Sequence, residues 1–288
     1  MGVDGNRMKA MVLGGSGLLG KSLVNQWEHD RLYCPSSREV DIRNAGTLQA
    51  AVGRVRPEWI ILSAAYTDVD GCETHPELAF SVNRDGALNV AQAAKRVGAR
   101  LLFLSSDYVF NGKKDSPYET EDVRDPQSVY GRSKAEAEIR LLDCLPGCCI
   151  VRTSWLFGTG GKCFPNTILR VAADRPVLDV VTDQRGCPTY APDLARAIVS
   201  LCRRDASGIV HATNAGECSW FEFAQEILKR AGLNNEVRPI TARQIARPAP
   251  RPAYSVLSPR SLARWQVTMP AWQDALDRYL LERQSLAS

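Results

Sequence analysis

Residues 9–20 read Lys9-Ala-Met-Val-Leu-Gly-Gly-Ser-Gly-Leu-Leu-Gly20 and carry the main signal for the fold of the chain. Its apolar first part, Lys9 to Leu13, predicts a buried strand, and a helix from about Leu18 to Trp27 follows the glycine turn. Glycine has no Cβ, so backbone N–H groups in such a turn can approach a pyrophosphate at the helix N-terminus. Glycine triplets also occur in ordinary tight turns. The position between a first strand and a helix favours a dinucleotide-binding turn.

Strands and helices alternate beyond this turn. Short apolar runs predict strands at Leu32–Cys34, Trp59–Ser63, Arg100–Ser105 and Cys149–Thr153, and a long helical period covers Pro76–Val97. Further helices are expected at Phe164–Ala173, Pro192–Arg203, Ser219–Ala231 and Ala271–Arg283. Alternation of this kind predicts an α/β fold, a Rossmann-type doubly wound parallel sheet.

The 288 residues correspond to roughly two domains. We expect residues 1–154 to form mainly the Rossmann domain that binds the dinucleotide. Residues 155–288 should form mainly a smaller C-terminal α/β lobe that binds the substrate, with some segments returning to the Rossmann domain.

Composition excludes several classes of protein. With 44% hydrophobic and 24% charged residues, the chain is an ordinary globular protein rather than a disordered or fibrous one. The net charge of +4 is small and the basic residues are not gathered, so we expect no nucleic-acid partner. No apolar run reaches the roughly 18 residues that span a membrane. The nine cysteines include no Cys-x-x-Cys pair, which favours free thiols in a reducing cytoplasm over a zinc site.

The residues after the second strand bear on the type of dinucleotide. Enzymes that use NAD usually place a carboxylate there, on the ribose 2′-hydroxyl. Here the chain has Ser36-Ser37-Arg38, and the first carboxylate is Glu39. Two hydroxyls and a guanidinium suit a 2′-phosphate, so the residues favour NADPH over NADH. The alternatives are that NADH is used, or that Arg38 is simply a solvated loop residue.

A second motif points to catalysis. In Tyr130-Gly131-Arg132-Ser133-Lys134, the tyrosine and lysine lie four residues apart and so share one face of a helix. A lysine ammonium beside a phenol favours the phenolate and lowers the pKa of the phenol toward the working range. Ser106, at the end of a predicted strand, supplies a hydroxyl for a substrate carbonyl. A Tyr-x-x-x-Lys spacing alone is common, but its combination with the glycine turn and Ser106 predicts a reductase.

At this point the chain resembles the extended short-chain dehydrogenase/reductase superfamily and, within it, the dTDP-4-dehydrorhamnose reductase family. The matching segments cover nearly the whole chain: Ala64-Ala-Tyr-Thr-Asp-Val-Asp70, Ser105-Ser-Asp-Tyr-Val-Phe110, Val129-Tyr-Gly131, Arg152-Thr-Ser-Trp155, Pro188-Thr-Tyr-Ala191 and Arg251-Pro-Ala-Tyr-Ser255. The glycine turn and the Tyr/Lys pair are shared by the superfamily. The Ser-Asp-Tyr-Val-Phe, Arg-Thr-Ser-Trp and Arg-Pro-Ala segments are more particular to the family.

The resemblance implies reduction of the 4-keto group of dTDP-4-dehydro-L-rhamnose to dTDP-L-rhamnose. It implies that Tyr130 donates the proton, that Lys134 binds the nicotinamide ribose and tunes Tyr130, and that Ser106 polarises the substrate. The cofactor contacts it implies are Gly14, Gly17, Leu18 and Leu19 on the pyrophosphate, Arg38 on the 2′-phosphate, Asp41 and Ile42 on the adenine, and Ala64, Ala65 and Tyr66 along its border. Asp107 and Trp155 would face the sugar, although an aromatic residue just past a strand is often a core residue.

The chain departs from the family pattern in three respects. Ser106 stands where many members have threonine, which keeps the hydroxyl. Cys163 stands where members often have asparagine, which puts one substrate contact in doubt. Some members bind Mg²⁺ through carboxylates at a homodimer interface, and no matching carboxylates are placed here. A homodimer remains an expectation.

Two other functions stay open. The regulatory subunit of methionine adenosyltransferase resembles this family and carries a similar Ala-Tyr-Thr-Asp-Val-Asp stretch, so a non-catalytic NADP-binding subunit is one alternative. A reductase, epimerase or dehydratase of another nucleotide sugar is the other. A dehydratase commonly has an added acidic pair after the catalytic serine, and Asp107-Tyr108 does not supply one.

Overall fold

A six-stranded parallel sheet forms the centre of the molecule. The computed structural model describes residues 8–27 and 31–286. The strands are β1 (Ala10–Leu13), β2 (Leu32–Tyr33), β3 (Trp59–Leu62), β4 (Arg100–Ser106), β5 (Cys149–Thr153) and β10 (Gly208–His211), in the order β10-β5-β4-β3-β1-β2. Every neighbouring pair is parallel. The prediction of a Rossmann-type doubly wound sheet is therefore confirmed.

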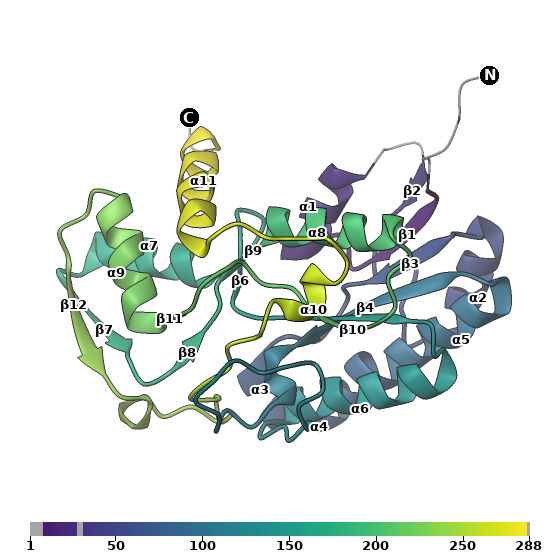
Figure 1. Ribbon diagram of the computed structural model, residues 1–288, viewed down its shortest axis with the longest axis horizontal. Coiled ribbons are helices and arrows are strands. Elements are labelled where there is room, and N and C mark those ends of the chain that lie inside the picture. Colours follow the sequence, from purple (N-terminus) through teal and green to yellow (C-terminus); the bar gives the residue numbers. More distant parts are fainter. Residues whose placement is uncertain (1–7, 28–30, 287–288) are drawn as a thin grey trace.

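Helices cover both faces of this sheet (Figure 1). The helices α1 (Leu18–Gln26) and α8 (Ala191–Arg203) share one hydrophobic core with side chains of β1, β3, β4 and β5. The helices α2 (Ala45–Val55), α5 (Ala87–Val97) and α6 (Val129–Cys144) share a second core with the opposite face. Side chains that alternate along each strand supply both cores, which explains why the strands appear as continuous apolar runs.

The structure differs from the predicted elements in several respects, among them three in and around the central sheet. The helix predicted at Pro76–Val97 is divided into α4 (Pro76–Phe80), a π-helical turn, η2 (Ser81–Gly86), and α5. The helix α2 and the strand β10 were not predicted. The Asn44 side chain caps α2 by accepting hydrogen bonds from the backbone of Gly46 and Thr47, a signal that the sequence does carry.

The second half of the chain builds a lobe beside the sheet. Its helices are α7 (Phe164–Asp174), α9 (Trp220–Arg230) and α11 (Trp272–Ser285), which share a third core. Its strand pairs are β7 (Val177–Val181) with β12 (Glu236–Ile240), β6 (Leu156–Phe157) with β9 (Thr189–Tyr190), and β8 (Arg185–Gly186) with β11 (Cys218–Ser219). The predicted helices of this half are all present, with ends shifted by one or two residues.

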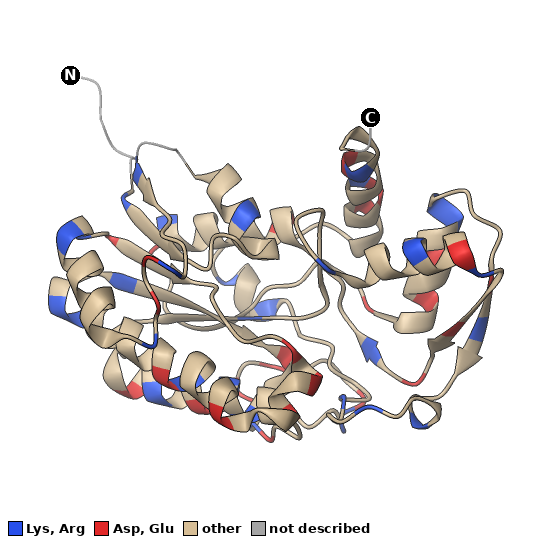
Figure 2. Cartoon of the chain, turned by 180° about the vertical axis from the view of Figure 1, so that it is seen from behind, with Lys and Arg blue, Asp and Glu red and all other residues tan. Residues whose placement is uncertain are grey.

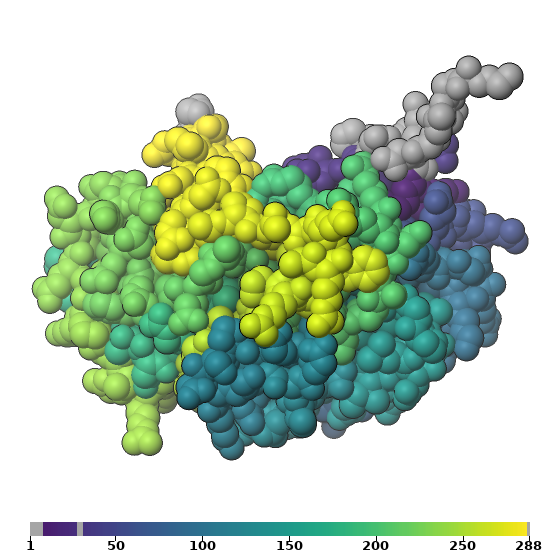
Figure 3. All heavy atoms as spheres, viewed as in Figure 1, coloured from purple at the N-terminus to yellow at the C-terminus, as the bar shows by residue number. Residues whose placement is uncertain are grey.

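The two halves are interleaved rather than consecutive. Both β10 and α8 lie in the second half of the sequence but pack with the central sheet. The C-terminal segment then returns from the lobe across the molecule, shown in yellow in Figure 3, and places α10 (Arg260–Ala263) near β10. Shorter elements are α3 (Val69–Thr74), η3 (Asp107–Val109) and η4 (Ala242–Gln244).

Basic and acidic residues are interspersed over the chain (Figure 2). None of the helices in the described residues combines the length and the apolar character needed to cross a membrane.

Candidate active site

A pocket of about 810 Å³ lies at the carboxyl ends of the parallel strands. Open α/β sheets bind their ligands at this edge. The pocket wall takes residues from the glycine turn, from the segments after β2 and β3, from the ends of β4 and β5, and from the start of α6. The predicted site residues in this wall are Gly14, Gly17, Leu18, Leu19, Asp41, Ile42, Ala64, Ala65, Ser106, Asp107, Tyr130, Lys134 and Trp155.

The glycine turn is tightly packed. Gly14 has a φ of +98°, and a Cβ there would collide with the backbone nitrogen of Ala64, while a Cβ on Gly20 would collide with the carbonyl of Gly14. The helix α1 then begins at Leu18 with Gly17 as its N-cap and no side-chain cap. An N-terminus of this kind attracts a phosphate group through the helix dipole and its N–H groups.

Asn83 organises the loop after β3, a role that the sequence analysis missed. Its side chain accepts a hydrogen bond from the Tyr66 backbone N–H (2.8 Å) and donates to the Tyr66 carbonyl (3.0 Å) and to the Ser133 hydroxyl (2.9 Å). The Ser133 hydroxyl in turn donates to the carbonyl of Tyr130. Asn83 is buried in the π-helical turn and so ties the Ala64–Tyr66 loop to α6. The sequence carries one signal for this role, a polar asparagine within the apolar helical period of Pro76–Val97.

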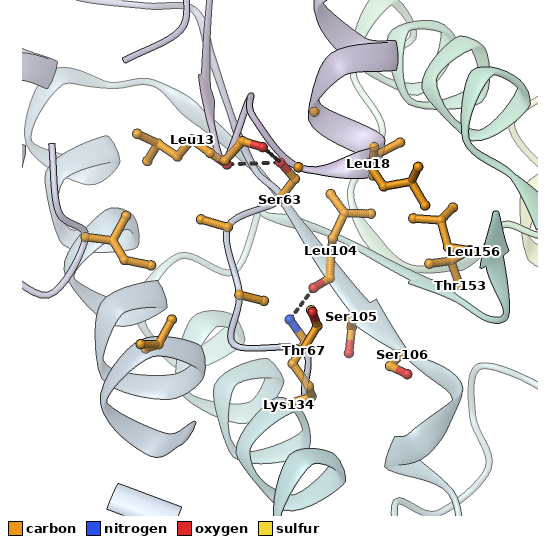
Figure 4. A pocket seen from close by; sticks show the side chains of 18 of the residues that line it. Leu13, Leu18, Ser63, Thr67, Leu104, Ser105, Ser106, Lys134, Thr153 and Leu156 are labelled. Atoms are coloured by element: carbon orange, nitrogen blue, oxygen red, sulfur yellow. Dashed lines mark hydrogen bonds between the residues drawn. The ribbon is translucent and has the colours of Figure 1, made fainter. Parts of the chain in front are cut away.

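The helix α6 presents Tyr130 and Lys134 to the pocket. It begins after Ser128, whose hydroxyl accepts a hydrogen bond from the Gly131 N–H (3.1 Å). The Lys134 ammonium donates to the Leu104 carbonyl (2.5 Å), drawn in Figure 4 as the dashed line between these two residues, and lies 4.0 Å from the centre of the Phe103 ring. The structure therefore brings both residues of the Tyr/Lys pair to the end of β4, beside Ser106.

Burial dominates the charge state of Lys134. Removal from water lowers the pKa of its ammonium to about 7, and the negative charge of Glu138, one turn further along α6, acts in the opposite direction. The group is therefore poised between its charged and neutral forms near neutral pH.

Tyr130 is affected in the opposite sense. Burial raises the pKa of its phenol well above the ordinary value, and hydrogen bonding with Ser106 offsets only part of this. The ring packs edge to face against Tyr108, with centroids 5.5 Å apart. The predicted lowering of this pKa by Lys134 is not found in the protein without its cofactor, where burial is the largest influence on the phenol. The phenol is thus protonated at neutral pH, which is the form that a proton donor requires.

Ser106 and Asp107 form the polar end of the site. The Ser106 hydroxyl donates to the Asp107 carboxylate (2.8 Å) and accepts from the Tyr108 N–H (3.2 Å). Burial raises the pKa of Asp107 to about 6, against hydrogen bonds with Ser255 and Ser106 that lower it. Asp107 Oδ2 and the Thr153 hydroxyl are buried in the pocket wall without a hydrogen-bond partner within the described chain. Both are available to a bound polar ligand.

A buried ionic network supports this end from behind. The Ser105 hydroxyl donates to Glu138 (2.5 Å), and Arg152 on β5 donates to both oxygens of the same carboxylate (2.9 and 2.7 Å). Burial alone would raise the pKa of Glu138, but the Arg152 guanidinium holds it below its ordinary value. Paired in this way, the network fixes β4, β5 and α6 relative to one another.

Comparison with known proteins places this architecture in a family. The family model for the RmlD substrate binding domain matches residues 8–285. A spore coat polysaccharide biosynthesis protein of Bacillus subtilis is 37% identical over 96% of this chain and 98% of its own. A dTDP-4-dehydrorhamnose reductase of Sinorhizobium fredii is 37% identical over 94% of this chain and 96% of its own. The chain belongs to the dTDP-4-dehydrorhamnose reductase family.

A solved structure of the same family matches the fold closely. The dTDP-4-dehydrorhamnose reductase of Bacillus anthracis, in complex with NADP, superposes with a TM-score of 0.93 at 36% identity, covering 96% of this chain and all of that chain. The central sheet, the lobe and their interleaving are therefore family features.

Three residues that the family resemblance associates with the cofactor or the substrate lie outside the pocket wall. Arg38 is exposed and does not line the pocket. Arg43, which forms an ion pair with Asp41 (2.6 Å), lines the pocket instead. Tyr66 is also outside the wall, although its backbone is fixed by Asn83. Cys163 is buried with its thiol 3.5 Å from the Gly158 carbonyl, away from the lining.

Some residues in the pocket wall were not predicted. Lys162 contributes an exposed cation from the loop before α7, and Thr153 and Ser154 contribute hydroxyls from the end of β5. Within residues 8–27 and 31–286, no group of three or more His, Cys, Asp or Glu side chains is arranged to hold a metal ion.

Proposed function

We propose that this protein reduces the 4-keto group of dTDP-4-dehydro-L-rhamnose to dTDP-L-rhamnose with NADPH. One observation carries the proposal. The hydroxyl of Ser106, the protonated phenol of Tyr130 and the buried amine of Lys134 line one pocket with a glycine turn, in a chain of the dTDP-4-dehydrorhamnose reductase family.

The residues present fit a nicotinamide dinucleotide. A Cβ would collide with neighbouring atoms at Gly14, Gly15 and Gly20 of the glycine turn. The turn stands at the N-terminus of α1, so Gly14, Gly17, Leu18 and Leu19 would hold the pyrophosphate. Asp41 and Ile42 would border the adenine, and Ala64 and Ala65 the middle of the cofactor. When bound, NADPH supplies the hydride for C4 of the sugar. Arg38 or Arg43 would meet the 2′-phosphate.

Side chains of the protein would bind and protonate the oxygen of the ketone. Ser106 turns its hydroxyl from Asp107 toward the carbonyl oxygen and stabilises the negative charge that develops there. Tyr130 gives its phenolic proton to that oxygen as it becomes an alkoxide. The raised pKa of Tyr130 keeps the proton in place until the oxygen is strongly basic.

Lys134 has two roles in this proposal. Its amine is fixed by the Leu104 carbonyl and would donate to the hydroxyls of the nicotinamide ribose. In its charged form it also stabilises the Tyr130 phenolate that remains after proton transfer. A pKa near neutrality allows the proton lost by Tyr130 to be replaced through Lys134.

The alternatives make different use of the same fold. A non-catalytic regulatory subunit would need no Ser106, Tyr130 or Lys134, and all three are present in one pocket, which favours an enzyme. A reductase of another nucleotide sugar would keep these residues and differ only at the sugar end of the pocket.

The deciding experiment follows NADPH oxidation with two dTDP-linked sugars, dTDP-4-dehydro-L-rhamnose and dTDP-4-keto-6-deoxy-D-glucose. The UDP-linked counterparts of both sugars are tested in parallel. We expect oxidation with the dTDP-linked L-sugar and a weaker rate with NADH in place of NADPH. Oxidation with only another sugar would support the second alternative, and no oxidation with any sugar would support the regulatory subunit.

The expectations of a homodimer and of a cytoplasmic location remain part of this proposal. Light scattering coupled to size-exclusion chromatography, with and without Mg²⁺, tests the first of them directly. Cell fractionation tests the second.

A further inference from the structure

Trp155 has a strained backbone at the edge of the pocket. Its φ is +45°, in the left-handed region that a bulky residue rarely adopts. It lies between β5 and β6 and lines the pocket. Strain of this kind persists only when the surroundings impose it, and it is concentrated at functional sites. The contacts of Trp155 therefore show what holds it.

Trp220 covers one face of the Trp155 ring. The two indoles are stacked with centroids 3.4 Å apart and ring planes 6° from parallel. Trp220 is the first residue of α9, directly after Ser219 of the capping box, and it packs against Phe164 on α7 (4.5 Å). A capped helix start and a third aromatic ring thus hold Trp220 itself in place.

Gly186 lies against the edge of the same ring. A Cβ on this residue would lie 2.5 Å from Trp155 Cε2, so only glycine leaves room for the indole. Gly186 is in β8, which pairs with β11, and its partner in the pair is Cys218. Since Cys218 precedes Trp220 by two residues, the two supports of the Trp155 ring belong to one small unit of the lobe.

The backbone around Trp155 is bound to the same part of the chain. The Trp155 carbonyl accepts a hydrogen bond from the Thr189 N–H (3.2 Å), and the Ser154 hydroxyl donates to the Cys187 carbonyl (2.7 Å). Trp155 is thereby fixed on its flanking backbone, on one ring face and on one ring edge, and the rest of the indole is left for the pocket.

We propose that Trp220 and Gly186 are positioning residues that fix the Trp155 ring as an aromatic wall for the sugar of the substrate. The inference rests on the proposed function and deepens it. An indole fixed in this way offers an apolar surface to the C–H groups of a pyranose ring and to the methyl group of a 6-deoxy sugar. Neither Trp220 nor Gly186 lines the pocket, so both act through Trp155.

Three variants and a control test this. Trp220→Leu removes the stacked ring, Trp220→Phe keeps a smaller one, and Gly186→Ala displaces the edge of the Trp155 ring. Trp265→Phe is the matched control, because Trp265 is also half-buried but packs against the core between the sheet and α8. Each variant is first shown to melt cooperatively and to bind NADPH with wild-type affinity.

Two readouts separate positioning from general stability. Stacked indoles produce an exciton couplet in the far-ultraviolet circular dichroism spectrum, which we expect to be lost in both Trp220 variants and kept in Trp265→Phe. For Trp220→Leu we expect the KM for the sugar nucleotide to rise about five- to tenfold with the dissociation constant for NADPH unchanged, and for Trp220→Phe a smaller rise. Gly186→Ala should raise the KM in the same way.

The outcomes are distinct. Trp220→Leu with a wild-type KM, or with an intact couplet, overturns the positioning role. Equal rises in KM for Trp220→Leu and Trp265→Phe also overturn it, because the effect would then be one of stability. A wild-type protein that reduces no dTDP-linked sugar overturns the proposed function instead, and the couplet then still decides whether Trp220 fixes Trp155.

Discussion

Lys134 donates a hydrogen bond from its ammonium to the backbone carbonyl of Leu104 at 2.5 Å, which joins α6 to the end of β4. This bond explains how a long, flexible side chain reaches one defined place in the pocket. Both ends are buried, and burial is also what lowers the pKa of Lys134 to about 7. The buried position that allows Lys134 to reach the Leu104 carbonyl is therefore also the cause of its lowered pKa.

Lys134→Met should change how stability depends on pH. In the unfolded chain a lysine holds its proton up to about pH 10, whereas folded Lys134 loses it near 7. Between these two values the unfolded state binds more protons, so wild-type stability rises with pH. The variant lacks this contribution. In urea unfolding of both proteins from about pH 6 to about pH 10, the free energy of unfolding should rise more with pH for the wild type than for the variant. The same pH dependence in both proteins would contradict the lowered pKa of Lys134.

Asp107→Asn should stabilise the fold and impair the enzyme. The folded pKa of about 6 lies above the ordinary value, so the unfolded state binds fewer protons between about pH 4 and 6 and wild-type stability falls across this range. At neutral pH the variant should be more stable by about 1 to 3 kcal/mol, with the gap closing in acid. Its catalytic efficiency should fall at least about tenfold, because the amide that replaces the carboxylate can no longer accept a hydrogen bond from the bound substrate at the position of Oδ2, which has no partner within the described chain.

Thermal unfolding at neutral and acid pH measures the first effect, and initial rates measure the second. Asp107→Asn with unchanged stability at neutral pH would show that the carboxylate is better solvated than its burial indicates.

Two glycine substitutions should act in opposite directions. Gly14→Ala places a Cβ against the Ala64 backbone at a φ of +98°, so we expect a loss of about 2 kcal/mol or more of stability and much weaker NADPH binding. Gly53→Ala, on the exposed face of α2 with nothing within 4 Å of the new Cβ, should stabilise the protein by up to about 1 kcal/mol. Chemical unfolding and NADPH titration check both. Similar effects at the two positions would mean that the turn is not specialised.

Much of the site could be predicted because its signals are local. The glycine turn connects one strand and one helix, and the spacing of Tyr130 and Lys134 is that of a single helical face, so both depend on neighbouring residues. The Ser219–Glu222 capping box at the start of α9 is a local signal as well.

The remaining features depend on contacts between distant segments. The stack of Trp155 on Trp220 joins residues 65 positions apart, and no short window of sequence contains both. The same holds for Asn83 and Ser133. The strand β10 is four residues long and is recognisable only through its pairing with β5, and the choice between Arg38 and Arg43 depends on the course of a loop.

Arg43 and Arg38 can be separated by their effect on cofactor preference. Arg43 lines the pocket and Arg38 does not, so Arg43→Ala should lower the ratio of kcat/KM for NADPH over NADH about tenfold, the effect of one charged hydrogen bond to a phosphate. Arg38→Ala is the matched control and should change the ratio little. Steady-state kinetics with both cofactors measures this. A large effect of Arg38→Ala alone would show that Arg38 binds the 2′-phosphate, as predicted from the sequence.

In the proposed NADPH-dependent ketone reduction, Tyr130 donates the proton. Tyr130→Phe removes the phenolic hydroxyl and leaves the ring against Tyr108. The most direct measurement is a single-turnover experiment in which excess enzyme, loaded with NADPH, is mixed with the dTDP-linked 4-keto sugar and the loss of NADPH absorbance is followed. We expect the wild type to oxidise NADPH in stoichiometric amount and Tyr130→Phe to be slower by about 10²- to 10⁴-fold with NADPH binding unchanged. A Tyr130→Phe variant that oxidises NADPH at the wild-type rate would show that Tyr130 is not the proton donor.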